Sequence, residues 1–183
     1  MTEPAGAFDY PNLSSRPPGP FVRAAGLALP GVRKVQAQVS SYAAAWQHSN
    51  AAALGAAGPL WVALGDSMTL GIGASAPDQG WVGQLGRRLT RDGEHYRIVN
   101  LAFSGARATD VLDRQLPTLR RLPQRPDLVP VLIGSNDTVR RSYRAALPTA
   151  YALLNDLGYA AMAAVFAEAI AGRQELGRPA VSA

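Results

Sequence analysis

The chain of 183 residues contains no cysteine, only two histidines and a single lysine, Lys34. Without cysteine, neither a disulfide framework nor a thiolate metal site can form. The two histidines, His48 and His95, lie far apart in the sequence. We therefore expect neither a metal centre nor a cofactor.

Long apolar runs and a secretory signal are also missing. The most apolar stretch, residues 51–64, is short and interrupted by Gly55, Gly58 and Pro59, so it does not span a bilayer. The first twenty residues lack the basic start and apolar stretch of a secretory signal. These absences predict a cytoplasmic protein with no membrane span.

The net charge of +5 raises nucleic acid as a partner. However, the arginines are spread through the chain with acidic residues among them. The densest basic pairs, at 87–88 and 120–121, fall late in predicted helices, where cations suit the helix dipole. No basic stripe with interleaved aromatic residues appears, so we predict no nucleic-acid partner.

The length and a hydrophobic content of 48% fit one domain preceded by an arm. Residues 1–30 are predicted to form a flexible N-terminal arm, since residues 1–20 are rich in Pro, Gly and Ser. Residues 31–56 hold a predicted helix, whose apolar positions recur at three- and four-residue spacing: Val35, Val39, Tyr42 and Trp46. Residues 57–183 form the remaining domain.

From residue 60 onward, strand and helix patterns alternate, which predicts an α/β fold with a parallel sheet. The predicted elements are strand 60–64, helix 78–91, strand 97–103, helix 108–121, strand 128–133, and helices 139–154 and 157–172. Pro117 is expected to kink its helix or end it early. Pro130 cannot donate to a sheet ladder, so we expect its strand at an edge.

A short polar motif follows each of the three predicted strands: Gly65-Asp66-Ser67, Ser104-Gly105 and Gly134-Ser135-Asn136-Asp137. Each motif alone is common in turns or helix caps. If the strands are parallel neighbours, however, the motifs gather at the carboxyl edge of the sheet, where open α/β sheets bind ligands. A serine, a backbone amide and an asparagine amide would then share one crevice.

This combination suits nucleophilic attack on an ester. A serine hydroxyl attacks once a base takes its proton, and the attack creates an oxyanion that needs fixed hydrogen-bond donors. The backbone N–H of Ser67 would be one donor and the side-chain amide of Asn136 another. Gly105 would supply a third N–H, because the absence of a Cβ lets a substrate oxygen come close.

The three motifs, with Met68 following the first, resemble the first three sequence blocks of the SGNH, or GDSL, hydrolases. The resemblance implies a flavodoxin-like three-layer α/β/α sandwich within residues 57–183, and hydrolysis of a small-molecule ester through an acyl-enzyme. By position, it implies that Ser67 is the nucleophile and that Ser67, Gly105 and Asn136 donate to the oxyanion. It leaves Asp66 and Asp137 to brace the turns.

The sequence departs from the family in the last block, Asp-x-x-His near the C-terminus, whose histidine is the general base. No histidine follows Asn136. The formal match, residues 92–95, is predicted to lie in a loop at the opposite end of the sheet from Ser67, roughly 20 Å away along a strand. His48 precedes the first strand and is expected on the wrong side too, unless the arm folds over.

The C-terminal part suggests how the base was lost. Residues 155–159 and the apolar stripe Tyr159, Met162, Phe166 and Ile170 resemble the family's final helix, which usually begins just after a His-Pro pair. Here Leu153 and Leu154 occupy that place, and only 46 residues follow Asp137 in the 183-residue chain. We infer an internal deletion around Leu154, natural, engineered or from a faulty gene model, that truncates the sheet by missing strands.

Two classes of function stay open. The first is a serine esterase or lipase of the SGNH type, in which Ser67 is acylated and water releases the acyl group. The second is a non-catalytic relative that binds acyl or sugar-ester ligands in the same crevice, or an inactive deletion product.

Overall fold

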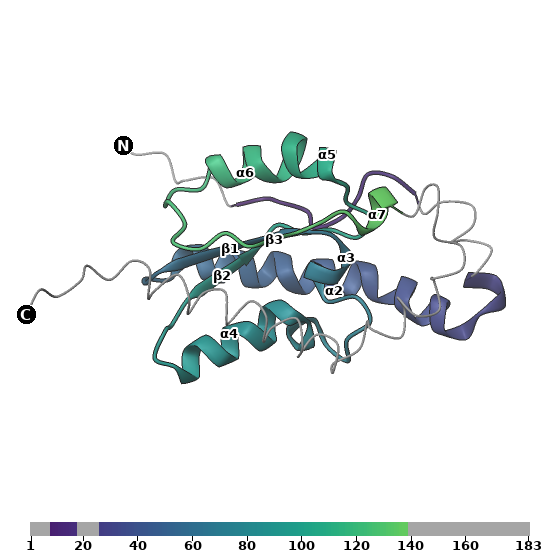
Figure 1. Cartoon of the computed structure of the whole chain (residues 1–183), viewed down its shortest axis with the longest axis horizontal. Helices are drawn as coiled ribbons and strands as arrows, with labels where there is room; N and C mark the ends of the chain where they lie inside the picture. The colour runs from purple at the N-terminus through teal and green to yellow at the C-terminus, as the bar shows by residue number, and fades with distance from the viewer. Residues whose placement is uncertain (1–7, 18–25, 139–183) are drawn as a thin grey trace, which may run out of the picture.

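The computed structural model describes residues 8–17 and 26–138, so the helices predicted over 139–154 and 157–172 lie outside the described residues. The described residues surround a parallel three-stranded sheet (Figure 1). Its strands are β1 (Leu60–Gly65), β2 (Arg97–Asn100) and β3 (Val131–Leu132), in the order β2-β1-β3. This is the beginning of the flavodoxin-like strand order, which confirms the predicted α/β class.

Helices cover both faces of the sheet (Figure 1). On one face lie α2 (Pro30–Gly55) and α4 (Trp81–Arg91); on the other lie α5 (Ala108–Asp110), the π-helical turn η2 (Val111–Gln115) and α6 (Leu116–Arg120). Because side chains alternate along a strand, β1 directs Trp61 and Ala63 toward α2 and α4. Its other residues Leu60, Val62 and Leu64 face the second layer. β1 is therefore buried on both faces.

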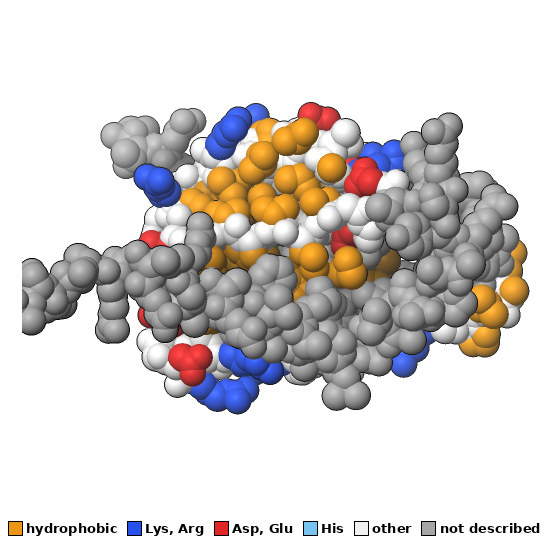
Figure 2. Space-filling model, in the orientation of Figure 1, with side chains coloured by type: hydrophobic (Ala, Val, Ile, Leu, Met, Phe, Trp, Pro, Cys, Tyr) orange, Lys and Arg blue, Asp and Glu red, His pale blue; other side chains and the backbone are white. Residues whose placement is uncertain are grey.

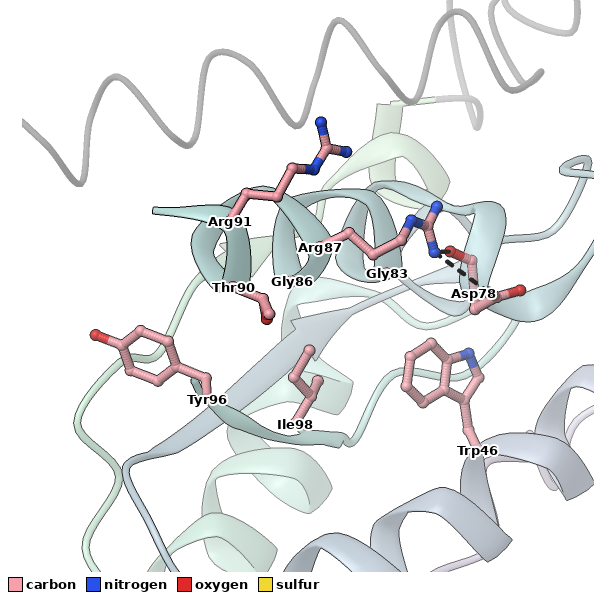
Figure 3. A pocket seen from close by; sticks show the side chains of 9 residues that line it. All are labelled: Trp46, Asp78, Gly83, Gly86, Arg87, Thr90, Arg91, Tyr96 and Ile98. Carbon is pink, nitrogen blue, oxygen red and sulfur yellow. Dashed lines mark hydrogen bonds and ion pairs between the residues drawn. The ribbon is translucent and has the colours of Figure 1, made fainter. Parts of the chain in front are cut away.

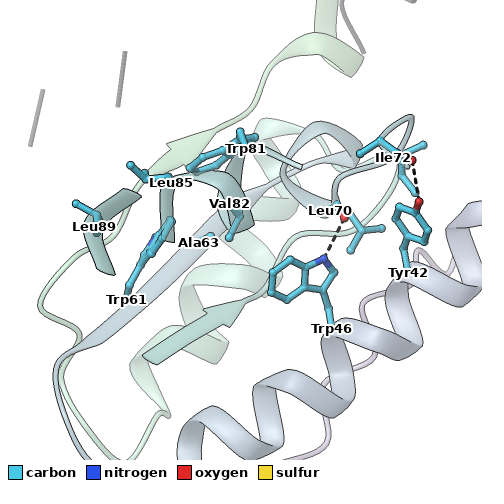
Figure 4. Close-up of a cluster of buried hydrophobic side chains, with 11 residues drawn as sticks. Tyr42, Trp46, Trp61, Ala63, Leu70, Ile72, Trp81, Val82, Leu85 and Leu89 are labelled. Atoms are coloured by element: carbon cyan, nitrogen blue, oxygen red, sulfur yellow. Dashed lines mark hydrogen bonds between the residues drawn. The ribbon is translucent and has the colours of Figure 1, made fainter. Parts of the chain in front are cut away.

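The apolar residues spaced three and four apart along α2 pack into, or against, one buried cluster between this helix, β1 and α4. Figure 4 shows Trp46 of α2, Trp61 of β1 and Leu85 of α4 within one buried cluster. Tyr42 is also buried there, and Val35 and Val39 pack against the cluster from the outside. The helix predicted from this stripe is confirmed.

The two prolines flagged in the sequence have different effects. The helical run does not end at Pro117 but continues to Arg120. Just before the proline it changes to π-helical geometry, with the Leu116 N–H bonded to the Val111 carbonyl five residues back. A π turn is a recognised way to accommodate an interruption in helical hydrogen bonding.

Pro130 explains why β3 is shorter than the predicted strand 128–133. The Leu64 N–H donates to the Pro130 carbonyl at 3.0 Å. In a parallel ladder, the residue that accepts this bond also donates its own N–H to residue 62, and proline has no N–H to donate. Regular pairing is thus confined to Val131–Leu132, at one edge of the described sheet, as predicted.

Residues 8–17 fall in the predicted arm, yet they pack on the sheet. The Tyr10 hydroxyl donates to the Leu101 carbonyl at 2.7 Å, and its side chain is buried. The buried Asn12 amide donates to the carbonyls of Asn100 and Ala102, both at 2.8 Å. A composition typical of an arm hides these two anchors, so this segment belongs to the folded body.

Apolar side chains are exposed on the side of the sheet that carries α5, η2 and α6. Figure 2 shows hydrophobic side chains gathered over the α5–α6 region. Leu112 of η2 is 62% exposed and Val131 of β3 is 47% exposed. Across the described ranges, no helix combines the length and the hydropathy needed to cross a bilayer.

Candidate active site

The first motif forms the turn between β1 and α3 (Ser67–Leu70). Asp66 caps this helix, because its carboxylate accepts a 3.0 Å hydrogen bond from the Met68 N–H. Gly71 ends it in the left-handed region, with φ of +88°, which glycine adopts without strain. Ser67 is therefore the first residue of a short helix and is half-buried. Within the described ranges, no residue forms a hydrogen bond with the Ser67 hydroxyl.

The third motif contacts the first through Asp66. This carboxylate is fully buried and accepts hydrogen bonds from the Ser135 hydroxyl and, at 3.4 Å, from the Asn136 amide. Burial raises the pKa of Asp66, although the hydrogen bonds from Ser135 and from the Met68 N–H partly oppose the increase. Asp66 thus holds α7 (Ser135–Thr138) beside the start of α3.

The third motif also contacts the second. Asn136 donates to the carbonyl of Ala106 at 2.8 Å, and Asp137 accepts from the Ala108 N–H at 3.0 Å. Gly105, next to Ala106, has φ of +80° and open space where a Cβ would lie. The three motifs therefore lie together at the carboxyl end of the sheet, as the predicted parallel order requires. Asp66 and Asp137 both bind backbone N–H groups, which confirms their bracing role.

The N-terminal segment reaches this loop as well. The Arg16 guanidinium donates to the Gly105 carbonyl at 3.3 Å and forms an ion pair with Asp110. Asp110 also accepts from the Arg107 N–H at 2.8 Å. Partial burial alone would raise the pKa of Asp110, but the hydrogen bonds and the charges of Arg16 and Arg107 outweigh it, so the pKa is lowered.

Helix α2 anchors the chain on the other side of Ser67. The indole N–H of Trp46 donates to the Leu70 carbonyl at 3.0 Å (Figure 4). The Tyr42 hydroxyl donates to the Ala74 carbonyl at 2.8 Å, and the Gln38 side chain accepts from the Gly73 N–H at 2.9 Å. The turn containing Ser67 is thus held by Asp66 on its N-terminal side and by α2 on its C-terminal side.

Neither histidine joins the site. His95 is exposed in the loop between α4 and β2, at the amino end of the strands, as predicted. His48 is exposed on α2. Among the residues that the structure describes, no cluster of three or more histidine, aspartate or glutamate side chains could hold a metal ion.

Two buried polar side chains near the site were not anticipated. Asn100 of β2 donates to the Thr69 carbonyl in α3 at 2.8 Å, and Gln115 of η2 bonds to Gly65 at the end of β1. The role of Asn100 could have been suspected from the sequence, since asparagine is depleted in strands and this one interrupts an apolar run. The role of Gln115 could not, because a glutamine in an amphipathic helix is normally expected to face water.

An open cavity of about 470 Å³ lies elsewhere, between α2, α4 and β2 (Figure 3). It is lined by Trp46, Asp78, Gly83, Gly86, Arg87, Thr90, Arg91, Tyr96 and Ile98. None of these residues belongs to the three motifs, and Arg87 forms an ion pair with Asp78 at 3.2 Å. The cavity is therefore separate from the candidate site.

Comparison with known proteins identifies the family. The sequence profile of the GDSL-like Lipase/Acylhydrolase family matches residues 63–176. The chain belongs to this family. The matched range includes all three motifs, whereas the N-terminal segment and α2 precede it. The hydrolase class is thus confirmed at the level of the family, as is the SGNH/GDSL resemblance.

Among curated proteins, Esterase TesA of Pseudomonas aeruginosa is 38% identical over 85 residues, which are 46% of this chain and 41% of that relative. The chain therefore matches about two fifths of the length of this esterase. No solved structure matches the chain with significance.

Proposed function

We propose that the three motifs form an ester-hydrolysing site in which Ser67 is the nucleophile. The backbone N–H groups of Ser67 and Gly105 and the side-chain amide of Asn136 hold the oxyanion. The observation that carries this proposal is the position of Asn136, which hydrogen-bonds both to Asp66, just before Ser67, and to Ala106, just after Gly105. Family membership supports the same chemistry.

In the reaction, the Ser67 oxygen attacks the ester carbonyl carbon and loses its proton to a base from the solvent, such as hydroxide or added imidazole. The carbonyl oxygen becomes an oxyanion that the three donors stabilise. The alcohol then leaves with a proton, and water releases the acyl group from Ser67. Asn136 offers its donor readily, because its bond to Asp66 is long at 3.4 Å while its bond to Ala106 at 2.8 Å keeps the amide oriented.

The rate is limited because neither histidine of the chain is placed to act as the general base for Ser67. Both histidines of the chain are exposed and neither bonds to Ser67. In serine hydrolases, loss of the base lowers turnover by about 10⁶, while the oxyanion hole and binding still leave about 10³ to 10⁴ over water. We accordingly propose slow hydrolysis of small esters, and that the segment with the family's Asp-x-x-His is missing near Leu154.

The test is p-nitrophenyl acetate hydrolysis by the parent chain and by Ser67→Ala, each with and without added imidazole as an external base. Imidazole reacts with the ester by itself, so the Ser67→Ala protein supplies the background at every concentration. We expect the parent chain to release p-nitrophenol above this background, with a larger excess when imidazole is present. Equal release by the two proteins under both conditions would refute the proposal.

The missing base also favours a second candidate, a non-catalytic relative that binds acyl or sugar esters. This candidate predicts equal release by the parent and Ser67→Ala, together with saturable binding of an acyl ligand such as octanoate measured by calorimetry. An Asn136→Ala variant should then bind octanoate more weakly than the parent. Absence of such binding would leave only the inactive deletion product.

A further inference from the structure

Gln115 is fully buried at the end of the π-helical turn η2, and both ends of its side-chain amide bond to one residue of β1. Its carbonyl oxygen accepts from the Gly65 N–H at 2.9 Å, and its NH₂ group donates to the Gly65 carbonyl at 2.8 Å. Gly65 is the last residue of β1 and lies two positions before Ser67. The amide of Gln115 therefore acts at the base of the turn that carries the nucleophile.

On the side of Gly65 that faces β2, the neighbouring strand does not supply the hydrogen bond that a regular parallel ladder would form with Gly65. The last bond between β1 and the chain of β2 runs from the Leu101 N–H to the Ala63 carbonyl at 2.9 Å. In a parallel ladder, the next bond would join the Gly65 N–H to the Leu101 carbonyl. That carbonyl instead accepts the Tyr10 hydroxyl at 2.7 Å. Gln115 thus takes the place of the strand that has diverged.

The π-helical turn accounts for how Gln115 reaches the strand. Its hydrogen bond joins residues five apart rather than four, so side chains within this turn, Gln115 among them, are rotated relative to those of a regular α-helix. A polar side chain in the middle of a helical run is thereby directed into the core. After the turn, α6 packs over the second face of the sheet through Leu116 and Leu119.

We propose that Gln115 is a positioning residue for Ser67: its amide fixes the Gly65 peptides and thereby the direction in which the Ser67 hydroxyl and N–H point. This inference rests on the proposed role of Ser67. Gln115 does not touch the substrate, so its loss lowers the rate of acylation and leaves substrate binding nearly unchanged.

The test compares the parent chain with Gln115→Met, which keeps the shape but not the hydrogen bonds, and with Gln47→Met, the same change at an exposed position of α2. Amide hydrogen exchange is followed by NMR. In Gln115→Met we expect the protection of the Gly65 amide to fall by about tenfold or more, while Val62 and Leu64 keep theirs. We expect the rate of p-nitrophenol release in the first turnover, which reports acylation, to fall while the ester concentration that gives half of its maximum stays nearly constant, and Gln47→Met to match the parent in both measurements.

A Gln115→Glu variant adds a pH-dependent readout. A protonated carboxyl reproduces the acceptor and donor of the amide, whereas a carboxylate cannot donate to the Gly65 carbonyl. We expect parent-like Gly65 protection factors at about pH 5 and reduced ones at about pH 8, because burial raises the pKa of a carboxyl.

The positioning role is overturned if Gln115→Met leaves Gly65 protection unchanged, lowers protection equally along all of β1, or hydrolyses the ester like the parent. Failure of the parent chain itself to show Ser67-dependent release would instead refute the proposed function. The exchange experiment does not depend on activity, so the two failures are distinguishable.

Discussion

The side-chain amide of Asn136 donates a 2.8 Å hydrogen bond to the backbone carbonyl of Ala106. This bond joins α7 to the loop that follows β2, although thirty positions separate the two residues. It also orients the amide that we propose as an oxyanion donor. Asn136 therefore has a structural role beside the chemical role that we propose for it, and a substitution should affect the two by different amounts.

Asn136→Ala should lower Ser67-dependent release of p-nitrophenol by about 10² to 10³, the usual effect of removing one oxyanion donor. The loss of its hydrogen bonds should lower the free energy of unfolding by only about 1 kcal/mol. Release rates and urea unfolding measure the two effects. Asp137→Asn is the control, because it keeps an acceptor for the Ala108 N–H and should retain the parent rate. A parent-like rate in Asn136→Ala would remove this residue from the oxyanion hole.

Gly65→Ala should destabilise the fold. A Cβ at this position would lie 2.2 Å from the Thr69 hydroxyl oxygen and 2.4 Å from the Leu132 carbonyl oxygen. Since one of these contacts is with backbone, we expect a loss of about 1–3 kcal/mol in the free energy of unfolding. Gly31→Ala is the matched control, because nothing lies within 4 Å of its Cβ position in α2 and alanine favours helix. Equal stability of the two variants would contradict this packing.

The stability contributions of Asp110 and Asp66 should depend on pH with opposite signs. The pKa of Asp110 is lowered in the folded chain, so its contribution is present above the unfolded value of about 3.9 and is lost as pH falls. The pKa of Asp66 is raised, so its contribution is present below that value and is lost as pH rises. Unfolding free energies of the parent, Asp110→Asn and Asp66→Asn across acid to neutral pH test this.

The advantage of the parent over Asp110→Asn should therefore grow between acid and neutral pH, whereas its advantage over Asp66→Asn should shrink. Differences that change with pH in the same direction would show that one of the two assignments is wrong.

Asn12→Leu should loosen the N-terminal segment. The substitution removes the donors to the carbonyls of Asn100 and Ala102 and the acceptor for the Asn50 amide. Because these groups are buried, we expect a cost of about 1–3 kcal/mol in the free energy of unfolding, measured by urea denaturation. Ser15→Ala changes an exposed side chain of the same segment and should stay within about 0.5 kcal/mol of the parent. A cost no larger than that of Ser15→Ala would mean that residues 8–17 are not anchored in solution.

Periodicity and motif position were sufficient to predict the frame of the molecule. The three- and four-residue spacing along α2 follows from burial of one helix face, and the continuous apolar run of β1 follows from burial of both of its faces. The gathering of the motifs follows from parallel strand order alone. These features depend on local patterns that each segment carries in its own sequence.

The details around Ser67 could not be predicted, because they depend on contacts between distant segments. Gln115 bonds to Gly65 where the chain of β2 diverges from β1, and the carbonyl of Leu101 at that point accepts from Tyr10, over ninety residues earlier in the chain. The packing of residues 8–17 depends likewise on Asn12 meeting Asn50 and Asn100. The composition of this segment predicts a flexible arm, because composition alone does not indicate which side chains form buried hydrogen bonds with distant residues.

The most direct test of the central claim is to find the acyl group on Ser67. Because p-nitrophenolate leaves readily, the missing base should slow the attack of water on the acyl-enzyme more than acylation itself. Acetyl-Ser67 should therefore accumulate when the folded chain is incubated with p-nitrophenyl acetate and quenched in acid. Peptide mass spectrometry should then locate acetyl on Ser67 in the folded chain and not in the urea-unfolded chain. Acetylation of Lys34 with Ser67 left unmodified would contradict the account.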